Sequence, residues 1–401
     1  MLVARRLRQV ALLPWIGLLT VSLLLWVRKP DSFHNPQFWA EDGSIFFGQQ
    51  VQLGARAHLE PYAGYFNAVP RLVASLTALL PHRHAPALYN AAALLVLLAL
   101  AWKLYSPRLG LRWPLPFALA VVLVPHPGGE VFVCLANVQW ILALLLLAVL
   151  LQRSPESGAQ AAGDAGVVLL SGLTGPFILL ALPLLVVKAW RSRSRWDLML
   201  LAVAAGTATV QLWSLLHAPI DEPPPLAPAP GVWGRLLGAK LVGALFLGPK
   251  LPYAVPPIVL CCAGLCLLAG ILWTLRRSPE ALERAVYSLL FAGAVIAAAF
   301  AKFAAAPGHL IPYGAGARYF FIPAVVVAWC LLQVVFSTRG APRAMASAAL
   351  LAILASSLLS SFRSPPLEDL RWEEQAARIG GPEKELWIPI HPHPWMIHIL
   401  Q

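Results

Sequence analysis

The chain has 401 residues, of which 59% are hydrophobic and only 12% are charged, and its mean hydropathy is +0.70. Soluble globular proteins carry about 25% charged residues, so this composition excludes an ordinary soluble enzyme, a disordered chain and a disulfide-stapled secreted domain. The net charge of +12 comes largely from short segments between apolar runs. Such a distribution argues against a nucleic-acid partner, which needs a clustered basic face, and is typical of a polytopic membrane protein.

The N-terminus predicts an uncleaved first membrane span. Arg5, Arg6 and Arg8 precede an apolar run over residues 10–27. Arg28-Lys29-Pro30 then follows, where a signal peptide would have a small-residue cleavage site. Because cytoplasmic segments are enriched in Lys and Arg, we expect the N-terminus to be cytoplasmic.

Further along the chain, apolar runs and Lys/Arg-rich loops predict an all-α membrane domain over residues 1–361 with eleven spans. A span needs about 20 apolar residues. The predicted spans cover residues 10–27, 86–102, 113–125, 138–151, two shorter helices within 165–190, 196–216, 254–275, 284–303, 318–336 and 344–361. An odd count places the tail, residues 362–401, outside, where we expect it to pack on the membrane domain of a protein of the bacterial inner membrane.

The first outside loop, residues 28–85, contains a segment that resembles a span. In residues 65–80 the apolar residues recur with a helical period, while Asn67, Arg71 and Ser75 share the other face. This pattern predicts a helix that lies in the membrane interface. A crossing here would also put Lys103, Arg108 and Arg112 outside, against the expected bias. Residues 233–247 are a second candidate interfacial helix.

Residues 35–51 (NPQFWAEDGSIFFGQQV) hold the most informative polar group, the adjacent carboxylates Glu41 and Asp42. Large aromatic residues flank the pair on both sides. Adjacent carboxylates repel, and apolar surroundings disfavour their charged forms, so the pKa of one of them should rise. A carboxylate with such a pKa can act as a general base. The alternative is that one of them caps the helix that begins at Gly43 and pairs with an arginine.

The order of these features resembles the GT-C superfamily of membrane glycosyltransferases, which use polyprenyl-phosphate-linked sugars. The resemblance rests on a first span, an acidic pair early in a long outside loop, Glu130 in the second outside loop (126–140), and Arg318-Tyr319 before a late span. Leu173-Thr174-Gly175-Pro176 also looks like the L-T-K-G-P turn of some members. Because this chain lacks the lysine of that turn, the role of that lysine is not carried over.

The resemblance implies specific roles. Asp42 would be the general base, with Glu41 as the alternative, in an inverting transfer. Arg318 would bind the donor phosphate, because an arginine fork matches phosphate oxygens, although it could instead reach to lipid headgroups. Glu130 would contact the acceptor, or would form an ion pair with Arg71 or another loop cation. Further candidates are Lys302, His309, Arg235 and Lys240 for the donor phosphate, and Asn137 and Tyr319 for the acceptor.

The implied partners are a polyprenyl-phosphate-linked sugar, an acceptor that is a glycan, lipid or protein, and membrane lipids. No cofactor is certain. A divalent cation, Mg²⁺ or Mn²⁺, is possible because Glu41, Asp42 and Glu130 offer oxygen ligands. The alternatives are a transporter or flippase of a lipid-linked sugar, or a non-catalytic scaffold. A transporter would need charged residues midway along its spans, where this sequence has almost none.

The cysteines and the tail histidines indicate no metal site. Most cysteines lie inside apolar runs, and Cys134 has no loop partner, so we expect small core residues rather than disulfides. His391, His393 and His398 are close in sequence, but zinc sites usually have four ligands. We expect the tail to fold back over the outer face, with Trp372, Trp387 and Trp395 at the membrane interface.

Overall fold

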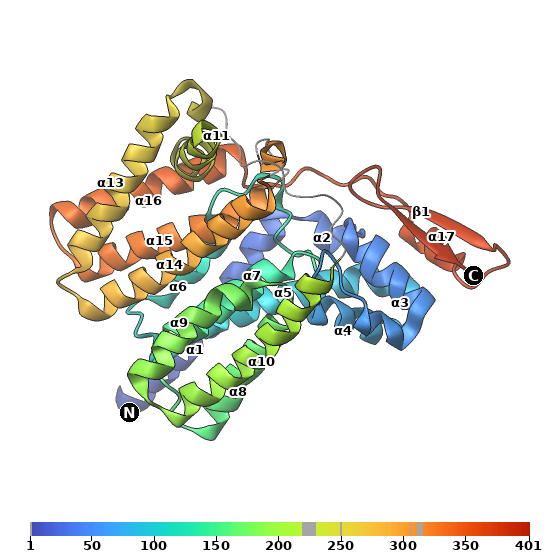
Figure 1. The fold of residues 1–401 in the computed structure, drawn as a ribbon, viewed down its shortest axis with the longest axis horizontal. Helices are drawn as coiled ribbons and strands as arrows, with labels where there is room; N and C mark the ends of the chain where they lie inside the picture. Colours follow the sequence, from blue (N-terminus) through green and yellow to red (C-terminus); the bar gives the residue numbers. More distant parts are fainter. Residues whose placement is uncertain (1, 219–229, 249–250, 305, 311–315) are drawn as a thin grey trace.

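The computed structural model is mostly helical, as predicted, and ends in a small β-hairpin that was not predicted (Figure 1). It describes residues 2–218, 230–248, 251–304, 306–310 and 316–401. The longer helices are α1 (Leu2–Arg28), α4 (Ala68–Thr77), α5 (Ala85–Leu104), α6 (Pro114–Leu123), α7 (Val138–Leu151), α8 (Gly158–Gly172), α9 (Phe177–Ser192), α10 (Arg195–His217), α13 (Pro257–Leu275), α14 (Pro279–Lys302), α15 (Phe321–Ser337) and α16 (Ala341–Ser360).

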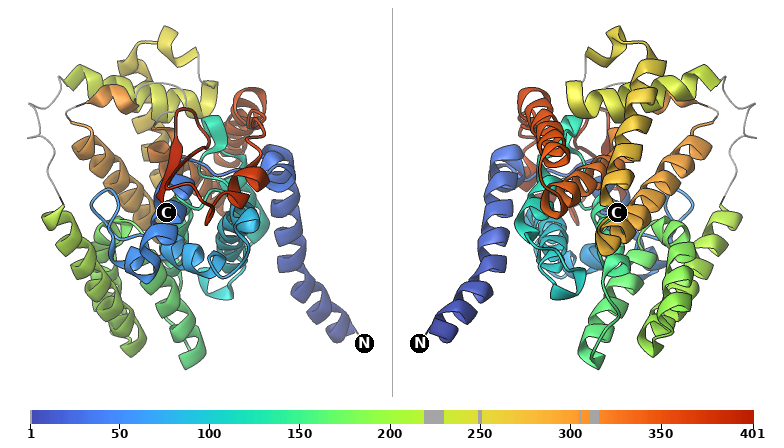
Figure 2. Two further views of the ribbon diagram at one scale, coloured as in Figure 1. Left: turned by 90° about the vertical axis from the view of Figure 1, so that its right-hand side faces the viewer. Right: turned by 90° about the vertical axis from the view of Figure 1, so that its left-hand side faces the viewer.

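Short elements connect these helices. Those that matter for the site are η1 (Asp42–Phe47), α3 (Gly48–Leu53), η4 (Pro107–Leu109), η5 (Pro127–Gly129) and η9 (Ala317–Phe320). The stretch predicted as interfacial over 233–247 is helical too, as α11 (Pro230–Arg235), η6 (Leu236–Gly243) and α12 (Ala244–Leu247). In Figure 2, α1 stands at one edge of the bundle and points its N-terminal end away from it.

Helices occur at all of the predicted spans, but they differ in length. Within the described residues, six segments are long and apolar enough to cross a membrane: His82–Leu104, Arg195–His217, Pro257–Leu275, Pro279–Lys302, Ala317–Ser337 and Ala341–Ser360. By contrast, α6 and α7 have 10 and 14 residues, or about 15 and 21 Å at 1.5 Å per residue, against a hydrocarbon core of about 30 Å. A multi-pass helical membrane protein fits these helices, and the count of eleven stays a prediction.

The centre of the bundle is α7. Its sequence after Gln139 is apolar all round, which is the pattern of a helix that is surrounded by protein. From Trp140 to Leu150 every residue is buried. Helices α5, α8, α9, α14 and α15 all contact it (Figure 1). The ends of α7 therefore determine which loops meet at each end of the core.

The connection from α6 to α7 was predicted as an outside loop; the structure shows that it is packed inside protein, and its side of the membrane stays a prediction. Residues 131–135 are buried, none more than 3% exposed. The guanidinium of Arg28 is buried as well and donates to the carbonyls of Val122 and Val124, at the end of α6. Irregular backbone at such depth is tolerated where protein satisfies its polar groups, and here Arg28 does so.

The break predicted over Leu173–Pro176 is confirmed, because α8 ends at Gly172 and α9 begins at Phe177. The break forms backbone hydrogen bonds with the first loop. Ala68 donates to the carbonyl of Leu173 at 2.9 Å, and Gly175 donates to the carbonyl of Phe66 at 2.9 Å. These two hydrogen bonds thus fix the backbone of residues 66–68 against the break between α8 and α9.

Helix α4 is amphipathic as predicted, and the structure shows which face packs on protein. Arg71 is 1% exposed and donates to Gln49 at 2.5 Å and to the carbonyl of Glu60 at 3.0 Å. Leu72 and Leu76 are exposed. The polar face therefore holds the first loop together, and the leucines point outward. At about 15 Å for its 10 residues, α4 is too short to cross a membrane.

The tail folds back onto the first loop, as predicted, through α17 (Trp372–Ala377) and an antiparallel hairpin of β1 (Glu385–Pro389) and β2 (Met396–Leu400) (Figure 1). Strand β2 contacts η1 and α3. Trp372, predicted at a membrane interface, is buried between Phe38 and Phe47, with ring centroids 4.7 and 5.5 Å away. The prediction failed because aromatic residues of the tail and of the first loop pack on one another.

We expect Trp372→Ala to release the tail from the first loop. The substitution removes a buried indole and its hydrogen bond to the carbonyl of His82 at 3.0 Å, and truncation of a buried Trp costs about 3–5 kcal/mol. Limited proteolysis should then cut within residues 362–401 much faster than in the wild type. Trp387→Ala is the matched control, because Trp387 is 50% exposed. Equal cleavage in the two variants would contradict this account of tail docking.

Candidate functional site

A cavity of about 510 Å³ lies beside the first loop, a volume typical of small-molecule sites. Its polar wall includes Glu41, Tyr62, Asn137 and Arg318. Its apolar wall comes from the starts of α7 and α9 and the ends of α10 and α14: Trp140, Phe177, Leu179, Leu180, Leu215, Val295, Ala298 and Ala299. Charged groups and an apolar wall between helices therefore share one cavity.

Glu41 is the carboxylate of the acidic pair that lines this cavity. It is half-buried and accepts a hydrogen bond from the hydroxyl of Tyr62 at 3.1 Å. Glu41 immediately precedes η1 but makes no side-chain capping bond there, so the helix-cap alternative is not observed for it. A carboxylate held by one phenol keeps acceptor capacity toward a ligand.

Asp42, the other carboxylate of the pair, does not face this cavity. It is 2% exposed, and its carboxylate accepts from the backbone N–H of Ala136 at 2.6 Å and of Leu135 at 3.3 Å. Asp42 is not among the residues that line the cavity. The carboxylate predicted as the general base is therefore buried and holds the segment before α7 rather than facing the cavity.

Burial raises the pKa of Asp42 to about 7, and the neighbouring Glu41 raises it too, while the amides of Ala136 and Leu135 and the ammonium of Lys29 lower it. In the unfolded chain this carboxyl loses its proton near pH 4. Between about pH 4 and 7 the folded state therefore holds more protons than the unfolded state, and this group's contribution to stability falls as the pH rises. Above about pH 7 the contribution is constant.

We expect the difference in melting temperature, Asp42→Asn minus wild type, to increase between pH 4 and 7 and to stay constant at higher pH. The reason is that the amide cannot ionise, so the variant lacks the pH-dependent loss. Melting curves of the detergent-solubilised protein measure this effect. Asp369→Asn, at an exposed position, is the control. Parallel pH profiles of Asp42→Asn and wild type would contradict the raised pKa.

Glu130 and Arg318 form an ion pair at the edge of the site. The Nη1 of Arg318 lies 3.3 Å from the Oε2 of Glu130, and the Oε1 of Glu130 is buried with no hydrogen-bond partner among the described residues. Burial raises the pKa of Glu130, while the charge of Arg318 lowers it. Of the two cations left open for Glu130, Arg71 is excluded by its contacts in the first loop.

Two groups on the cavity wall have unpaired polar atoms. The Oε1 of Gln139 and the Nε1 of Trp140 are buried and have no partner within the described part of the chain. Gly175 has a φ of +82°, and a Cβ there would lie 2.1 Å from the Oε1 of Gln139. Glycine is thus required at this turn both by conformation and by the close approach of Gln139. An acceptor and a donor without partners in one cavity are suited to a ligand with hydroxyl groups.

The other predicted residues divide between the cavity and its surroundings. Lys302, Asn137 and Tyr319 line the cavity, and Asn137 also donates to the carbonyl of Glu130 at 3.1 Å. Arg235 is exposed on α11 and does not line the cavity. Lys240 lies over the ring of Phe320, also away from the cavity lining. The side chain of His309 lies outside the described residues.

The sequence did not predict a role in the site for Tyr62, Tyr65 or Lys29. The ammonium of Lys29 is buried and donates to the carbonyl of Phe132 at 2.8 Å, within the same loop that Asp42 holds. Two tyrosine hydroxyls in the same loop as the acidic pair were the available signal. Among the described residues, no three His, Cys, Asp or Glu side chains are grouped so that they could hold a metal ion. The five cysteines are free thiols.

Comparison with known proteins adds no relative: no protein-family model, curated protein or solved structure matches this chain.

Proposed function

We propose that this chain is a membrane glycosyltransferase that moves a sugar from a polyprenyl-phosphate donor to a hydroxyl acceptor in the Glu41 cavity. The observation that supports this most directly is the composition of the cavity wall, where Glu41 and Arg318 meet an apolar surface between α9, α10 and α14. A lipid-linked sugar phosphate has the same division into a polyol, an anion and a hydrocarbon chain.

In the proposed reaction, the carboxylate of Glu41 takes the proton of the acceptor hydroxyl as the hydroxyl oxygen bonds to the anomeric carbon. The bond from that carbon to the phosphate oxygen breaks, and its electron pair leaves with the polyprenyl phosphate. A single displacement inverts the anomeric centre. Arg318 meets the charge on the departing phosphate, because a guanidinium can donate two parallel hydrogen bonds to phosphate oxygens.

In this proposal Asp42 has a positioning role. Its bonds to the amides of Leu135 and Ala136 fix the segment between Glu130 and Asn137. Gln139 and Trp140, just beyond that segment, offer the unpaired acceptor and donor that sugar hydroxyls would satisfy. The proposed base is therefore Glu41, which was the alternative in the sequence interpretation.

The proposed side of action is the outer face of a bacterial inner membrane, because the first loop, on which the tail packs, lines the cavity and the Lys/Arg-rich loops lie elsewhere in the sequence. The alternative of a transporter needs a polar route past the core, and the packed apolar α7 offers none along its length from Trp140 to Leu150.

The test is incubation of the purified protein in vesicles with a panel of short-chain polyprenyl-phosphate sugars carrying a radiolabelled sugar. We expect release of polyprenyl phosphate and transfer of label to an acceptor in a membrane extract. Entry of an intact labelled donor into the other leaflet, without cleavage of its sugar–phosphate bond, would point to the transporter instead. Absence of both cleavage and donor binding across the panel would reject the proposal.

A further inference from the structure

A second cavity, of about 450 Å³, lies at the other ends of helices that form the first one. The Glu41 cavity takes its walls from the start of α7, the start of α9 and the end of α14. The second cavity takes its walls from the end of α7, the end of α9 and the start of α14. Because α7 has 14 residues and α14 has 24, the two cavities are separated by about 20–35 Å at 1.5 Å per residue.

The second cavity is lined mainly by cations: Arg108, Arg153, Lys188, Arg191 and Arg284, against the acidic residues Glu280 and Glu283. Some of these charges are already engaged. Lys188 donates to three carbonyls near the end of α7 and lies 4.0 Å from the carboxylate of Asp197. Arg191 pairs with Glu283 at 2.6 Å. Arg108 pairs with Asp164, whose second partner is Lys103. An excess of positive charge remains at the wall.

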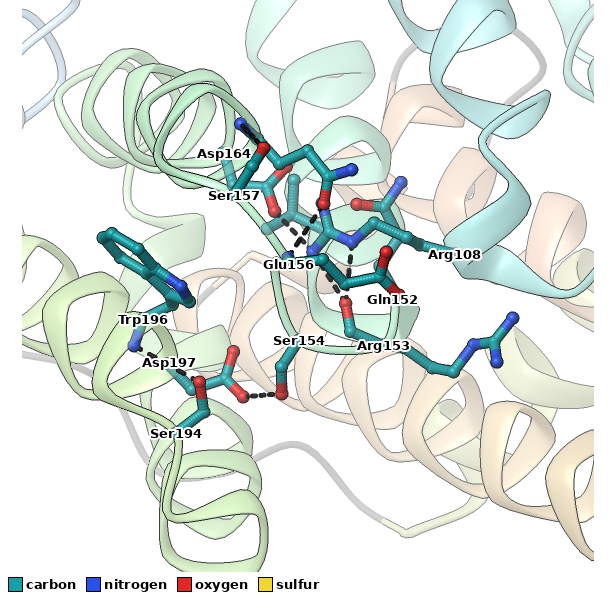
Figure 3. Close-up of polar contacts among 12 residues, drawn as sticks. Arg108, Gln152, Arg153, Ser154, Glu156, Ser157, Asp164, Ser194, Trp196 and Asp197 are labelled. Carbon is teal, nitrogen blue, oxygen red and sulfur yellow. Dashed lines mark hydrogen bonds and ion pairs between the residues drawn. The ribbon is translucent and has the colours of Figure 1, made fainter.

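Two cations of this wall retain donors. Among the described residues, Arg284 pairs only with Glu280, at 3.7 Å, and its Nε is buried with no partner. Arg153 is exposed, and within the same residues its guanidinium donates only to the carbonyl of Pro107, at 3.4 Å. Figure 3 shows Arg108 bonded to the backbone carbonyl of Arg153. Arg108 thus fixes the backbone from which the Arg153 side chain extends.

The independent sign of a ligand is Gln152. This residue lines the cavity and is 3% exposed, yet both its Nε2 and its Oε1 lack a hydrogen-bond partner among the described residues. A buried amide with neither group satisfied is rare in folded proteins. Its nitrogen can donate to an anion and its oxygen can accept from a hydroxyl or a water molecule.

We propose that this second cavity binds a phosphate group, with Arg153 and Arg284 as the charged donors and Gln152 as the neutral donor. Phosphate fits because it accepts several hydrogen bonds at once and carries the charge that the excess cations match. The same chemistry is offered by the headgroup of an anionic phospholipid and by a soluble phosphate, and the site lies on the opposite end of the helices from the proposed glycosyl transfer.

The experiment uses the full chain in neutral detergent with two probes. Inorganic phosphate, titrated by calorimetry, tests a soluble ligand. Phosphatidic acid, measured as an adduct by native mass spectrometry against phosphatidylcholine, tests a lipid headgroup. The variants are Gln152→Leu and Arg153→Gln, and the matched control is Arg277→Gln, an arginine that is also exposed but does not line the cavity.

We expect the wild type and Arg277→Gln to bind one probe alike and the two cavity variants to bind it about tenfold more weakly, as loss of one charge-assisted or buried hydrogen bond predicts. Binding of inorganic phosphate identifies a soluble ligand, and binding of phosphatidic acid alone identifies a lipid. Melting curves verify that each variant is folded. Failure of the wild type to bind either probe, or equal affinity in folded Gln152→Leu, Arg153→Gln and wild type, would overturn the proposal.

Discussion

Glu41→Gln is expected to lower sugar transfer by about 10²–10⁴-fold, the usual contribution of a general base, while the protein stays folded. The amide has nearly the shape of the carboxylate and can still accept from the hydroxyl of Tyr62, but it cannot take a proton. Turnover of a labelled donor at matched protein concentration measures the effect. Substrate binding should change much less than turnover.

Asp42→Asn is the matched control, since it makes the same change in the adjacent residue. We expect it to lose less than about tenfold in turnover, because the Asp42 carboxylate bonds to Leu135 and Ala136 rather than facing the cavity, and an amide oxygen can retain one of these bonds. Loss of turnover in Asp42→Asn with normal turnover in Glu41→Gln would return the role of base to Asp42, as first predicted from the sequence.

Arg318→Ala is expected to lower kcat/KM by about 10²-fold or more, and Arg318→Lys is expected to do nearly as much harm. The guanidinium is about a third exposed, lines the cavity and pairs with Glu130 at 3.3 Å. Two charge-assisted hydrogen bonds to phosphate oxygens account for such a loss. Lysine restores the charge but not the planar fork. Donor turnover and binding of polyprenyl phosphate are the measurements.

Arg235→Ala serves as the control for Arg318, because Arg235 was predicted for the same role but is exposed and does not line the cavity. It should change turnover little. Melting curves separate loss of the Glu130 ion pair from loss of phosphate binding. Full recovery of turnover in Arg318→Lys would assign Arg318 to charge alone, and equal effects of Arg318→Ala and Arg235→Ala would remove it from the proposed site.

Much of the architecture could be predicted from local sequence. Apolar runs bounded by Lys and Arg placed the helices, since a long apolar segment needs a surface to bury its side chains. The break over Leu173–Pro176 was predicted by Gly and Pro in one turn, whereas the aromatic residues of the tail predicted a membrane interface and Trp372 packs on the first loop instead. The hairpin was not predicted, because residues 385–400 are strands only through their pairing with each other and their packing on η1 and α3.

Part of the candidate site was also predicted from the sequence. Glu41 of the acidic pair, Arg318 and Tyr319 line one cavity, as their order suggested. Which carboxylate faces it was not readable, because adjacent residues on a helical turn point about 100° apart and the partner that selects Asp42 for burial is 94 positions away, at Ala136. Composition also gave no sign that Gln152 would be buried without a partner.

The sequence by itself therefore determined that this is a helical chain of the membrane-protein type with a charged first loop, since period and composition act over neighbouring residues. Only the tertiary structure decided which of its polar groups are used to hold the fold and which remain available for a ligand. Arg28 bonds to backbone carbonyls, Arg71 to a loop side chain and Asp42 to backbone amides. By contrast, Glu41 and Arg318 line a cavity. The physical reason is that a buried polar group needs a hydrogen-bond partner, and the fold can supply that partner from a residue far away in the sequence.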